Sequence, residues 1–301
     1  MGEASAWTHG VAAATGAATA TLLLQPLDVA KIALQSTRYV SGGQGFVGVL
    51  RDVVRRRGVS AAYAGLTPNV AGNMLAWGSY MAGYRTVRER LFTAAGNPDP
   101  ASRKAALLNG TASGIASTAS QLLTNPLWFL KTRMALAASD PTTADAVRGR
   151  GPSMFATARA AIAADGVLVL WRGSLASLAG VSHGIVQMII YERLKAATAD
   201  LAIVATPADG VSGLSSKAVL YIGLGSVAKS GATLITYPYQ VTRTQMQQVG
   251  GDRRIRDVLR RVWTTSGPAG FYRGLGAALV RVVPQAGITF SVYELVTTLL
   301  T

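Results

Sequence analysis

Stretches rich in Ala, Gly, Leu and Val alternate along the chain with shorter segments that carry most of its charge. The first apolar stretch is uncharged from 11 to 24 and can continue as a helix to 35, which is long enough to cross a bilayer. Small residues at this density favour close packing of helices within a membrane. The pattern predicts further membrane helices at 68–85, 107–132, 175–191, 218–245 and 277–300.

Three of the polar segments have an amphipathic pattern. Between 46 and 57, Val49 and Val53 recur at helical spacing against Arg51, Arg55 and Arg56. Such a pattern is typical of a short helix lying at a membrane surface. We expect surface helices at 46–57, 155–164 and 255–265. Glycines and hydroxyl residues interrupt the membrane spans, which favours helices that line a water-filled cavity.

A proline element recurs three times. Gln25-Pro26-Leu27-Asp28-Val29-Ala30-Lys31 returns around Pro126 and Pro238, each five residues before a base and at intervals of 100 and 112 residues. A second element follows each copy: a glycine, an aromatic residue five positions later, and a closing glycine two further on. Its copies are Gly58/Tyr63/Gly65, Gly166/Trp171/Gly173 and Gly267/Tyr272/Gly274.

Repetition of two linked elements in one order predicts tandem structural units. We expect one all-α membrane domain built of repeats at 1–95, 103–200 and 215–301. The predicted architecture has six transmembrane helices and three short surface helices in a pseudo-threefold bundle. A proline inside a helix removes a hydrogen bond and kinks it, so three similar kinks should surround the axis.

Composition supports a membrane protein. Half of the residues are hydrophobic and 14% are charged, whereas soluble domains carry about 25% charged residues. The net charge is +15, and 19 of the 29 Lys and Arg residues lie between a repeated proline and its closing glycine. Basic residues on one side of a membrane fit its topology and its anionic lipids better than they fit nucleic acid. A soluble basic α-solenoid is the alternative to a membrane protein.

The sequence gives little support for an enzyme. The chain has no cysteine and only His9 and His183, so neither a nucleophile–base pair nor a metal site is predicted. Residues 223–228 imitate a dinucleotide-binding turn, but no strand precedes them and no acid follows at the required distance. No bound cofactor is expected.

The two repeated elements resemble the signature of the mitochondrial carrier family across essentially the whole chain. Several tracts look most like the FAD and folate carrier branch, and Trp128 is shared with pyrimidine-nucleotide and NAD carriers. The tracts are Thr67-Pro68-Asn69 with Trp77-Gly78, Asn125-Pro126-Leu127-Trp128, Ser182-His183-Gly184 with Tyr191-Glu192, Tyr237-Pro238-Tyr239-Gln240 and Arg281-Val282-Val283-Pro284. The resemblance implies six transmembrane helices, three matrix-side helices and a central substrate site with alternating access.

Threefold packing would let the residue two after each proline meet the base of the next helix. We expect Asp28 to pair with Lys131 as a salt bridge. Trp128 would meet Arg243 by a cation–π contact, and Gln240 would meet Lys31 by a hydrogen bond. These six residues form a predicted matrix gate.

A second gate is predicted at the opposite ends of the helices. Tyr191-Glu192 and Tyr293-Glu294 occupy matching positions. Arg88 could therefore meet Glu192, and Lys195 could meet Glu294.

Counting back along each helix from its repeated proline also predicts substrate residues. Lys229 lies nine residues before Pro238 in an otherwise uncharged segment, where a cation is expensive unless it faces water or an anion. Family resemblance makes Gly72, Gly180 and Arg281 contact points at the cavity centre, and a guanidinium suits phosphate or carboxylate. The other expected substrate residues are Gln121, Tyr80, Val181, His183, Gln187 and Gln285.

The sequence therefore predicts a carrier, not an enzyme, that moves an anionic flavin or folate cofactor across the mitochondrial inner membrane. A pyrimidine-nucleotide or NAD carrier is the alternative within the family. A membrane assembly or binding factor without transport is the alternative from another class. We expect membrane lipids, cardiolipin among them, as partners of a monomer, and the membrane of another organelle is an open possibility.

Overall fold

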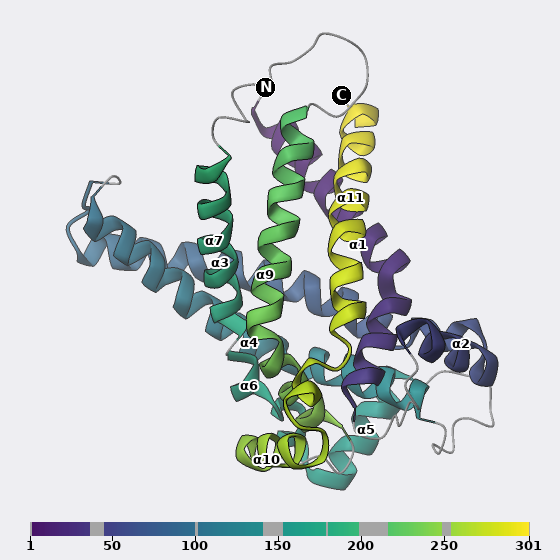
Figure 1. Cartoon of the computed structure of the whole chain (residues 1–301). Coiled ribbons are helices and arrows are strands. Elements are labelled where there is room, and N and C mark those ends of the chain that lie inside the picture. The colour runs from purple at the N-terminus through teal and green to yellow at the C-terminus, as the bar shows by residue number, and fades with distance from the viewer. Residues whose placement is uncertain are drawn as a thin grey trace.

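In the residues that it describes, the computed structural model is built of helices (Figure 1). The structure describes residues 2–36, 45–99, 102–140, 153–178, 180–198, 216–248 and 254–300. Within these ranges, the side chains of 2–7, 9–10, 106, 181, 216–220, 294 and 300 are not described. Every regular element in these ranges is helical.

Long helices make up the body of the molecule. They are α1 (Gly2–Gln35), α3 (Leu66–Ala94), α4 (Arg103–Ser139), α7 (Gly180–Ala197), α9 (Ser216–Gln247) and α11 (Leu275–Leu300). The short helix α6 (Ser174–Leu178) and α7 together cover the span predicted at 175–191, and residue 179 between them lies outside the described residues. Helices α3 and α4 run past their predicted bounds because hydropathy detects the apolar part of a helix and misses polar end turns.

A short helix and a turn of 3-10 helix follow each of α1, α4 and α9 in the chain. The short helices are α2 (Phe46–Arg57), α5 (Met154–Asp165) and α10 (Ile255–Ser266). The 3-10 turns are η1 (Val59–Tyr63), η3 (Val167–Trp171) and η4 (Pro268–Tyr272). The predicted surface helices therefore lie within one residue of their expected bounds.

The long helices associate in pairs drawn from neighbouring repeats: α3 with α4, α7 with α9, and α11 with α1. In Figure 1, α1, α7, α9 and α11 stand upright, whereas the α3–α4 pair leans away from them. Helix α1 begins and α11 ends at one end of the molecule, and α2, α5 and α10 lie at the other. Beyond their prolines, toward the end with the short helices, α1 contacts both α4 and α9.

Three of the buried clusters in the described residues follow one plan at this end of the molecule. In the first, Val49 and Val53 of α2 pack against Ala30 and Ala33 of α1. The second joins α4 to α5 and η3, and the third joins α9 to α10. Each repeat thus buries one face of its short helix against its own proline-containing helix, which is why the amphipathic pattern recurs in all three repeats.

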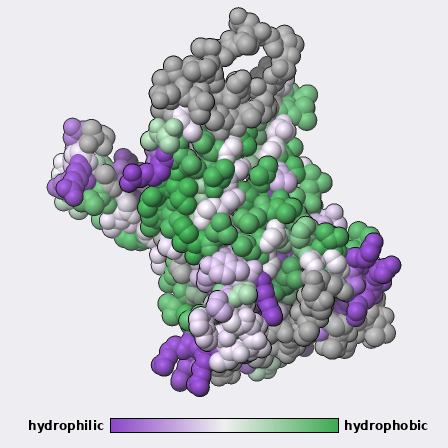
Figure 2. Space-filling model, viewed as in Figure 1, coloured by the Kyte–Doolittle hydropathy of each residue, from purple (hydrophilic) through white to green (hydrophobic). Residues whose placement is uncertain are grey.

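A broad apolar surface covers the upright helices, with hydrophilic residues gathered near α2 and α10 (Figure 2). Val11–Gln35, Val167–Ala197 and Pro268–Leu299 are long and apolar enough to cross a membrane by length and composition alone. The remaining long helices, α3, α4 and α9, have 29, 37 and 32 residues. They exceed the roughly 20 residues that a span requires.

Candidate functional site

The site is organised around the helix segments that follow Pro26, Pro126 and Pro238. Helices α1, α4 and α9 each continue through their proline. After it, α1 approaches both α4 and α9. The residues two and five positions after each proline lie in this region, so the charged residues of the repeated element meet where the helices converge.

Asp28 carries the densest group of contacts. Its Oδ2 accepts a hydrogen bond from Lys131 Nζ at 2.9 Å, and its Oδ1 forms an ion pair with the Arg281 guanidinium. The side chain of Asp28 is only 4% exposed. One buried carboxylate therefore links α1 to α4 and to α11. We call Asp28, Lys131, Arg281 and Asn69 the Asp28 cluster.

A chain of amides fixes the orientation of this cluster. Asn69 Oδ1 accepts a second hydrogen bond from Lys131 Nζ at 3.1 Å. Asn69 Nδ2 donates to Gln25 Oε1 at 2.9 Å, and Gln25 Nε2 donates to the Ala64 carbonyl at 2.9 Å. Because every amide has a defined donor and acceptor, Lys131 is held toward Asp28.

The equivalent base of the first repeat has a neutral partner. Lys31 Nζ donates to Gln240 Oε1 at 2.9 Å, which joins α1 to α9 as the sequence predicts. The ammonium also lies 5.7 Å from the centre of the Tyr237 ring. Tyr237 Oη accepts a hydrogen bond from Gln35 and donates to the Arg273 carbonyl, so the ring position is fixed as well.

The predicted cation–π contact between Trp128 and Arg243 is not formed in this structure. Lys131 Nζ lies 5.6 Å from the centre of the Trp128 ring. Lys131 is three residues further along the same helix and shares its face, so it reaches the ring before a residue from α9 can. The Trp128 indole N–H donates to Thr124 Oγ1 at 3.1 Å. Its ring lies against Gly72, where an added Cβ would meet it at 3.4 Å.

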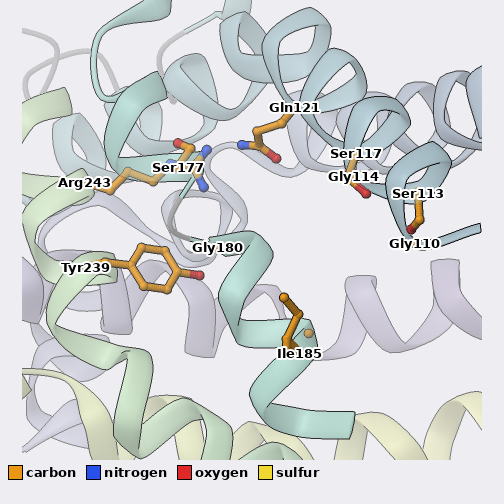
Figure 3. Close-up of a pocket in the computed structure, with 11 residues that line it drawn as sticks. Gly110, Ser113, Gly114, Ser117, Gln121, Ser177, Gly180, Ile185, Tyr239 and Arg243 are labelled. Carbon is orange, nitrogen blue, oxygen red and sulfur yellow. The ribbon is translucent and has the colours of Figure 1, made fainter. Parts of the chain in front are cut away.

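Arg243 instead borders a cavity of about 650 Å³. Its Nε is buried without a hydrogen-bond partner, and no ion pair joins its guanidinium to any residue that the structure describes. We call this space the Arg243 cavity. Its walls come from α4, α6, α7 and α9: Gly110, Ser113, Gly114, Ser117, Gln121, Ser177, Gly180, Gly184, Ile185, Tyr239 and Arg243 (Figure 3).

The closing glycine of each repeat packs on the base of the next. Gly65, Gly173 and Gly274 have φ of +77°, +81° and +79°, a region that side chains rarely enter. An added Cβ on Gly65 would lie 2.8 Å from the Lys131 carbonyl oxygen. On Gly274 it would lie 3.0 Å from the Lys31 carbonyl oxygen, and on Gly173 it would lie 3.6 Å from that of Arg243. Glycine thus permits the close approach of neighbouring repeats.

Lys229 and two of the predicted glutamines line a second cavity, of about 550 Å³. Lys229 Nζ lies 3.5 Å from Gln285 Oε1, and Gln187 is on the same wall. This cavity is bounded by α1, α7, α9 and α11. Lys229 forms no ion pair among the residues described, so this charge also faces open space.

Of the other predicted substrate residues, Gln121 and Gly180 line the Arg243 cavity, whereas Tyr80 and His183 line neither cavity. His183 Nδ1 lies 2.8 Å from Thr236 Oγ1, and Tyr80 Oη lies 3.1 Å from Ser113 Oγ. An added Cβ on Gly180 would lie 3.1 Å from the Tyr239 hydroxyl. The side chain of Val181 lies outside the described residues.

The predicted gate at the other end is not formed in this structure. Arg88 Nε donates to Asn109 Oδ1 at 2.8 Å, and its guanidinium lies 4.4 Å from the Phe92 ring centre. Glu192 and Lys195 are exposed. The expected meeting of Arg88 with Glu192 fails because the α3–α4 pair leans away from α7 (Figure 1). The side chain of Glu294, the expected partner of Lys195, is outside the description.

Sequence reasoning missed the residue directly before each proline. Gln25 donates to the Ala64 carbonyl, Asn125 Nδ2 donates to the Leu170 carbonyl at 2.9 Å, and Tyr237 donates to the Arg273 carbonyl at 3.1 Å. Each therefore ties its helix to the glycine loop of its own repeat. A hydrogen-bonding side chain at the same position in all three repeats was the available signal.

Comparison with known proteins agrees with this geometry. The family model described as mitochondrial carrier protein matches residues 2–95, 102–200 and 215–301. This chain belongs to the mitochondrial carrier family. Its predicted all-α carrier fold is confirmed, and like other members it is a transporter, not an enzyme. In the parts of the chain that the structure describes, no His, Asp and Glu side chains cluster as metal ligands would.

Several relatives align over nearly the whole chain. Folate transporter 1 (chloroplastic) of Arabidopsis thaliana is 31% identical, covering 98% of this chain and 96% of the relative. Nicotinamide adenine dinucleotide transporter 1 (chloroplastic) of the same plant is 32% identical, covering 94% and 88%. The mitochondrial FAD carrier protein FLX1 of Saccharomyces cerevisiae is 27% identical, covering 91% of each.

Proposed function

We propose that this carrier moves an anionic cofactor with a flat ring system, FAD or a folate, by alternating access. The observation that carries the proposal is Lys229, a cation within a membrane-length helix that faces a cavity and has only an amide beside it. Such a charge is expensive in a membrane unless water or an anion accompanies it. The relatives named for FAD and folate transport support this choice of substrate.

The Asp28 cluster and the Lys31–Gln240 hydrogen bond supply the matrix gate in this proposal. They join α1, α4, α9 and α11 where the proline helices converge. Arg281 then has two roles in the cycle. It pairs with Asp28 while the gate is closed, and the substrate anion replaces that carboxylate when the solute reaches the centre. Competition for one guanidinium would couple substrate binding to opening of the gate.

The ends of the helices bearing Arg88, Glu192 and Lys195 form the second gate. It would close when the matrix gate opens, by bringing the α3–α4 pair toward α7. This expectation is consistent with the absence of an Arg88–Glu192 contact in the present structure, in which the Asp28 cluster is intact.

We place the carrier in the mitochondrial inner membrane, as a monomer. The exposed basic residues of α2 and α10 lie beside the apolar surface (Figure 2), where they can contact anionic headgroups such as those of cardiolipin. The relatives named as chloroplastic make another organelle membrane the alternative.

An NAD carrier is the second candidate, because the NAD-transporting relative is as similar as the folate transporter. A pyrimidine nucleotide is the remaining candidate substrate that Trp128 suggests. All four solute classes are anionic and carry a flat ring, so transport measurements with each of them distinguish the candidates.

Uptake by proteoliposomes tests the function directly. The purified full-length chain is reconstituted into vesicles and offered labelled FAD, folate, NAD or a pyrimidine nucleotide. We expect saturable uptake of FAD or folate. Uptake of NAD or a pyrimidine nucleotide alone would transfer the function to the alternative, and a lack of all uptake would contradict the proposal.

The Arg281→Ala variant tests whether Arg281 binds the transported anion. We expect the variant to fold, because Asp28 keeps its hydrogen bond with Lys131, and to lose nearly all uptake. Arg273→Ala is the matched control, since Arg273 is an exposed arginine only eight residues earlier. Equal uptake by Arg281→Ala and the control would remove Arg281 from the substrate path.

A further inference from the structure

Arg243 differs from the two bases that occupy the same position in the other repeats. Lys131 donates to Asp28, and Lys31 donates to Gln240. Arg243 has neither a carboxylate nor an amide, and its Nε is buried without an acceptor. A largely buried cation with unmet hydrogen bonds is costly, which makes the position a candidate for an external anion.

The missing partner has a cause in the sequence. Trp128 stands two residues after Pro126, where the first repeat has Asp28. Its ring is already in contact with Lys131 and packs beside Gly72. No carboxylate from α4 therefore reaches Arg243, and the guanidinium faces the cavity instead (Figure 3).

Further polar groups surround the same space. Tyr239 lies one helical turn before Arg243, and Gln121 and Ser177 come from α4 and α6. In Figure 3 the Tyr239 hydroxyl and the Arg243 guanidinium extend from α9 into the opening, and the Gln121 amide extends from α4. A guanidinium with hydroxyl and amide donors beside it suits the oxygens of a phosphate or carboxylate.

Glycines form the rest of the wall. Gly110 and Gly114 of α4 and Gly184 of α7 line the cavity, and an added Cβ on any of them would meet nothing within 4 Å. The bare backbone leaves room for a planar ring next to the cation. At about 650 Å³ the cavity is within the usual range for small-molecule sites.

We propose that the Arg243 cavity is a second anion-binding subsite of the carrier, separate from the cavity that Lys229 lines. It takes a phosphate or carboxylate group of the transported solute, while the ring of the solute lies against the glycine wall. The identity of that solute rests on the proposed function. The existence of the anion subsite does not, and the gate role predicted for Arg243 is replaced by solute binding.

Ligand-dependent thermal stability of the purified full-length chain tests the subsite. Native protein and Arg243→Gln are titrated with FAD, with riboflavin as the ring without phosphates, and with inorganic pyrophosphate as the anion alone. We expect Arg243→Gln to unfold at no lower temperature than native protein in the absence of ligand, because it loses no partner. Its apparent affinities for FAD and pyrophosphate should fall about tenfold or more.

Two controls separate this role from a structural one. Lys131→Gln loses the Asp28 hydrogen bond, so it should unfold at a lower temperature even without ligand. Arg260→Gln removes an exposed arginine of α10 and should leave the titrations with FAD, riboflavin and pyrophosphate unchanged. If Arg243→Gln is destabilised like Lys131→Gln, or binds FAD and pyrophosphate as native protein does, the subsite is refuted.

A variant of the glycine wall tests the position of the ring. Gly184→Leu introduces a side chain into open space and should leave the fold intact. We expect weaker binding of FAD and riboflavin but unchanged binding of pyrophosphate. Unchanged binding of all three probes would contradict the ring position.

The remaining arms distinguish the source of the anion. If native protein ignores FAD yet is protected by pyrophosphate, and Arg243→Gln is not, the proposed substrate fails while the subsite stands. Parallel titrations use micelles containing cardiolipin or only phosphatidylcholine. If cardiolipin protects through Arg243 while FAD and pyrophosphate do not, the subsite belongs to a lipid headgroup and the proposal is overturned.

Discussion

The Asp28 cluster and the Arg243 cavity occupy equivalent positions in the threefold arrangement, yet they treat charge in opposite ways. In the cluster, one buried carboxylate serves two cations from α4 and α11. In the cavity, one cation has no carboxylate at all. The repeated element therefore supplies a base at each position, and the residue on the neighbouring helix determines what that base does.

The third position is intermediate between these two. Lys31 has a partner, but the partner is the neutral amide of Gln240. The three positions thus form a series: Lys131 in an ion pair, Lys31 in a hydrogen bond with a neutral amide, and Arg243 facing a cavity. Symmetry would favour identical contacts, so the departures from it are where we expect specificity for the solute. Substitutions that change one member of the series test this comparison.

The largest effect should come from Asp28→Asn. The change leaves Lys131 and Arg281 without their carboxylate, and loss of one partner of a buried ion pair costs about 3–5 kcal/mol. We expect a large drop in the unfolding temperature and loss of uptake. Scanning fluorimetry of the purified protein and proteoliposome uptake measure the two effects.

Glu89→Gln is the control for that substitution. It removes the carboxylate from the Arg85–Glu89 pair, whose side chains are 83% and 61% exposed. Exposed pairs contribute about 0–1 kcal/mol. Similar losses from Asp28→Asn and Glu89→Gln would mean that the cluster has no special role in holding the helices together.

The sequence predicts the fold well because repetition and hydropathy act over many residues. The three surface helices follow from their amphipathic pattern, and the pairing of Asp28 with Lys131 follows from the spacing of the proline element under threefold packing. The second partner of Asp28 does not, because Arg281 lies on α11 and its reach depends on how that helix crosses α1. The spacing of the proline element also allowed Trp128 to face Arg243. In the structure, the Trp128 ring instead contacts Lys131, which lies one turn away on the same helix.

The next largest effect should distinguish Gly65 from Gly173. Both have φ near +80°, so alanine at either position is strained by about 1–2 kcal/mol. At Gly65 the new Cβ would also lie 2.8 Å from the Lys131 carbonyl oxygen, whereas at Gly173 the nearest atom would be 3.4 Å away. We expect Gly65→Ala to lower the unfolding temperature more than Gly173→Ala.

These two variants differ mainly in how tightly the next repeat is packed. Equal destabilisation would show that backbone strain alone explains both. It would also show that the Asp28 side of the molecule is no more closely packed than the Arg243 side, which would weaken the contrast between the two regions.

The smallest effect should come from Gln240→Glu, which moves the intermediate position toward an ion pair. Lys31 Nζ already lies 2.9 Å from Gln240 Oε1, and the substitution changes little in shape. A charged hydrogen bond is stronger than a neutral one, so we expect a gain of about 1 kcal/mol in the closed state. Uptake should slow by about fivefold, because the more stable closed state must still open in each cycle.

The exposed Asn97→Asp adds the same charge away from the gate and should change neither quantity. Faster uptake by Gln240→Glu would mean that opening of this contact does not limit transport.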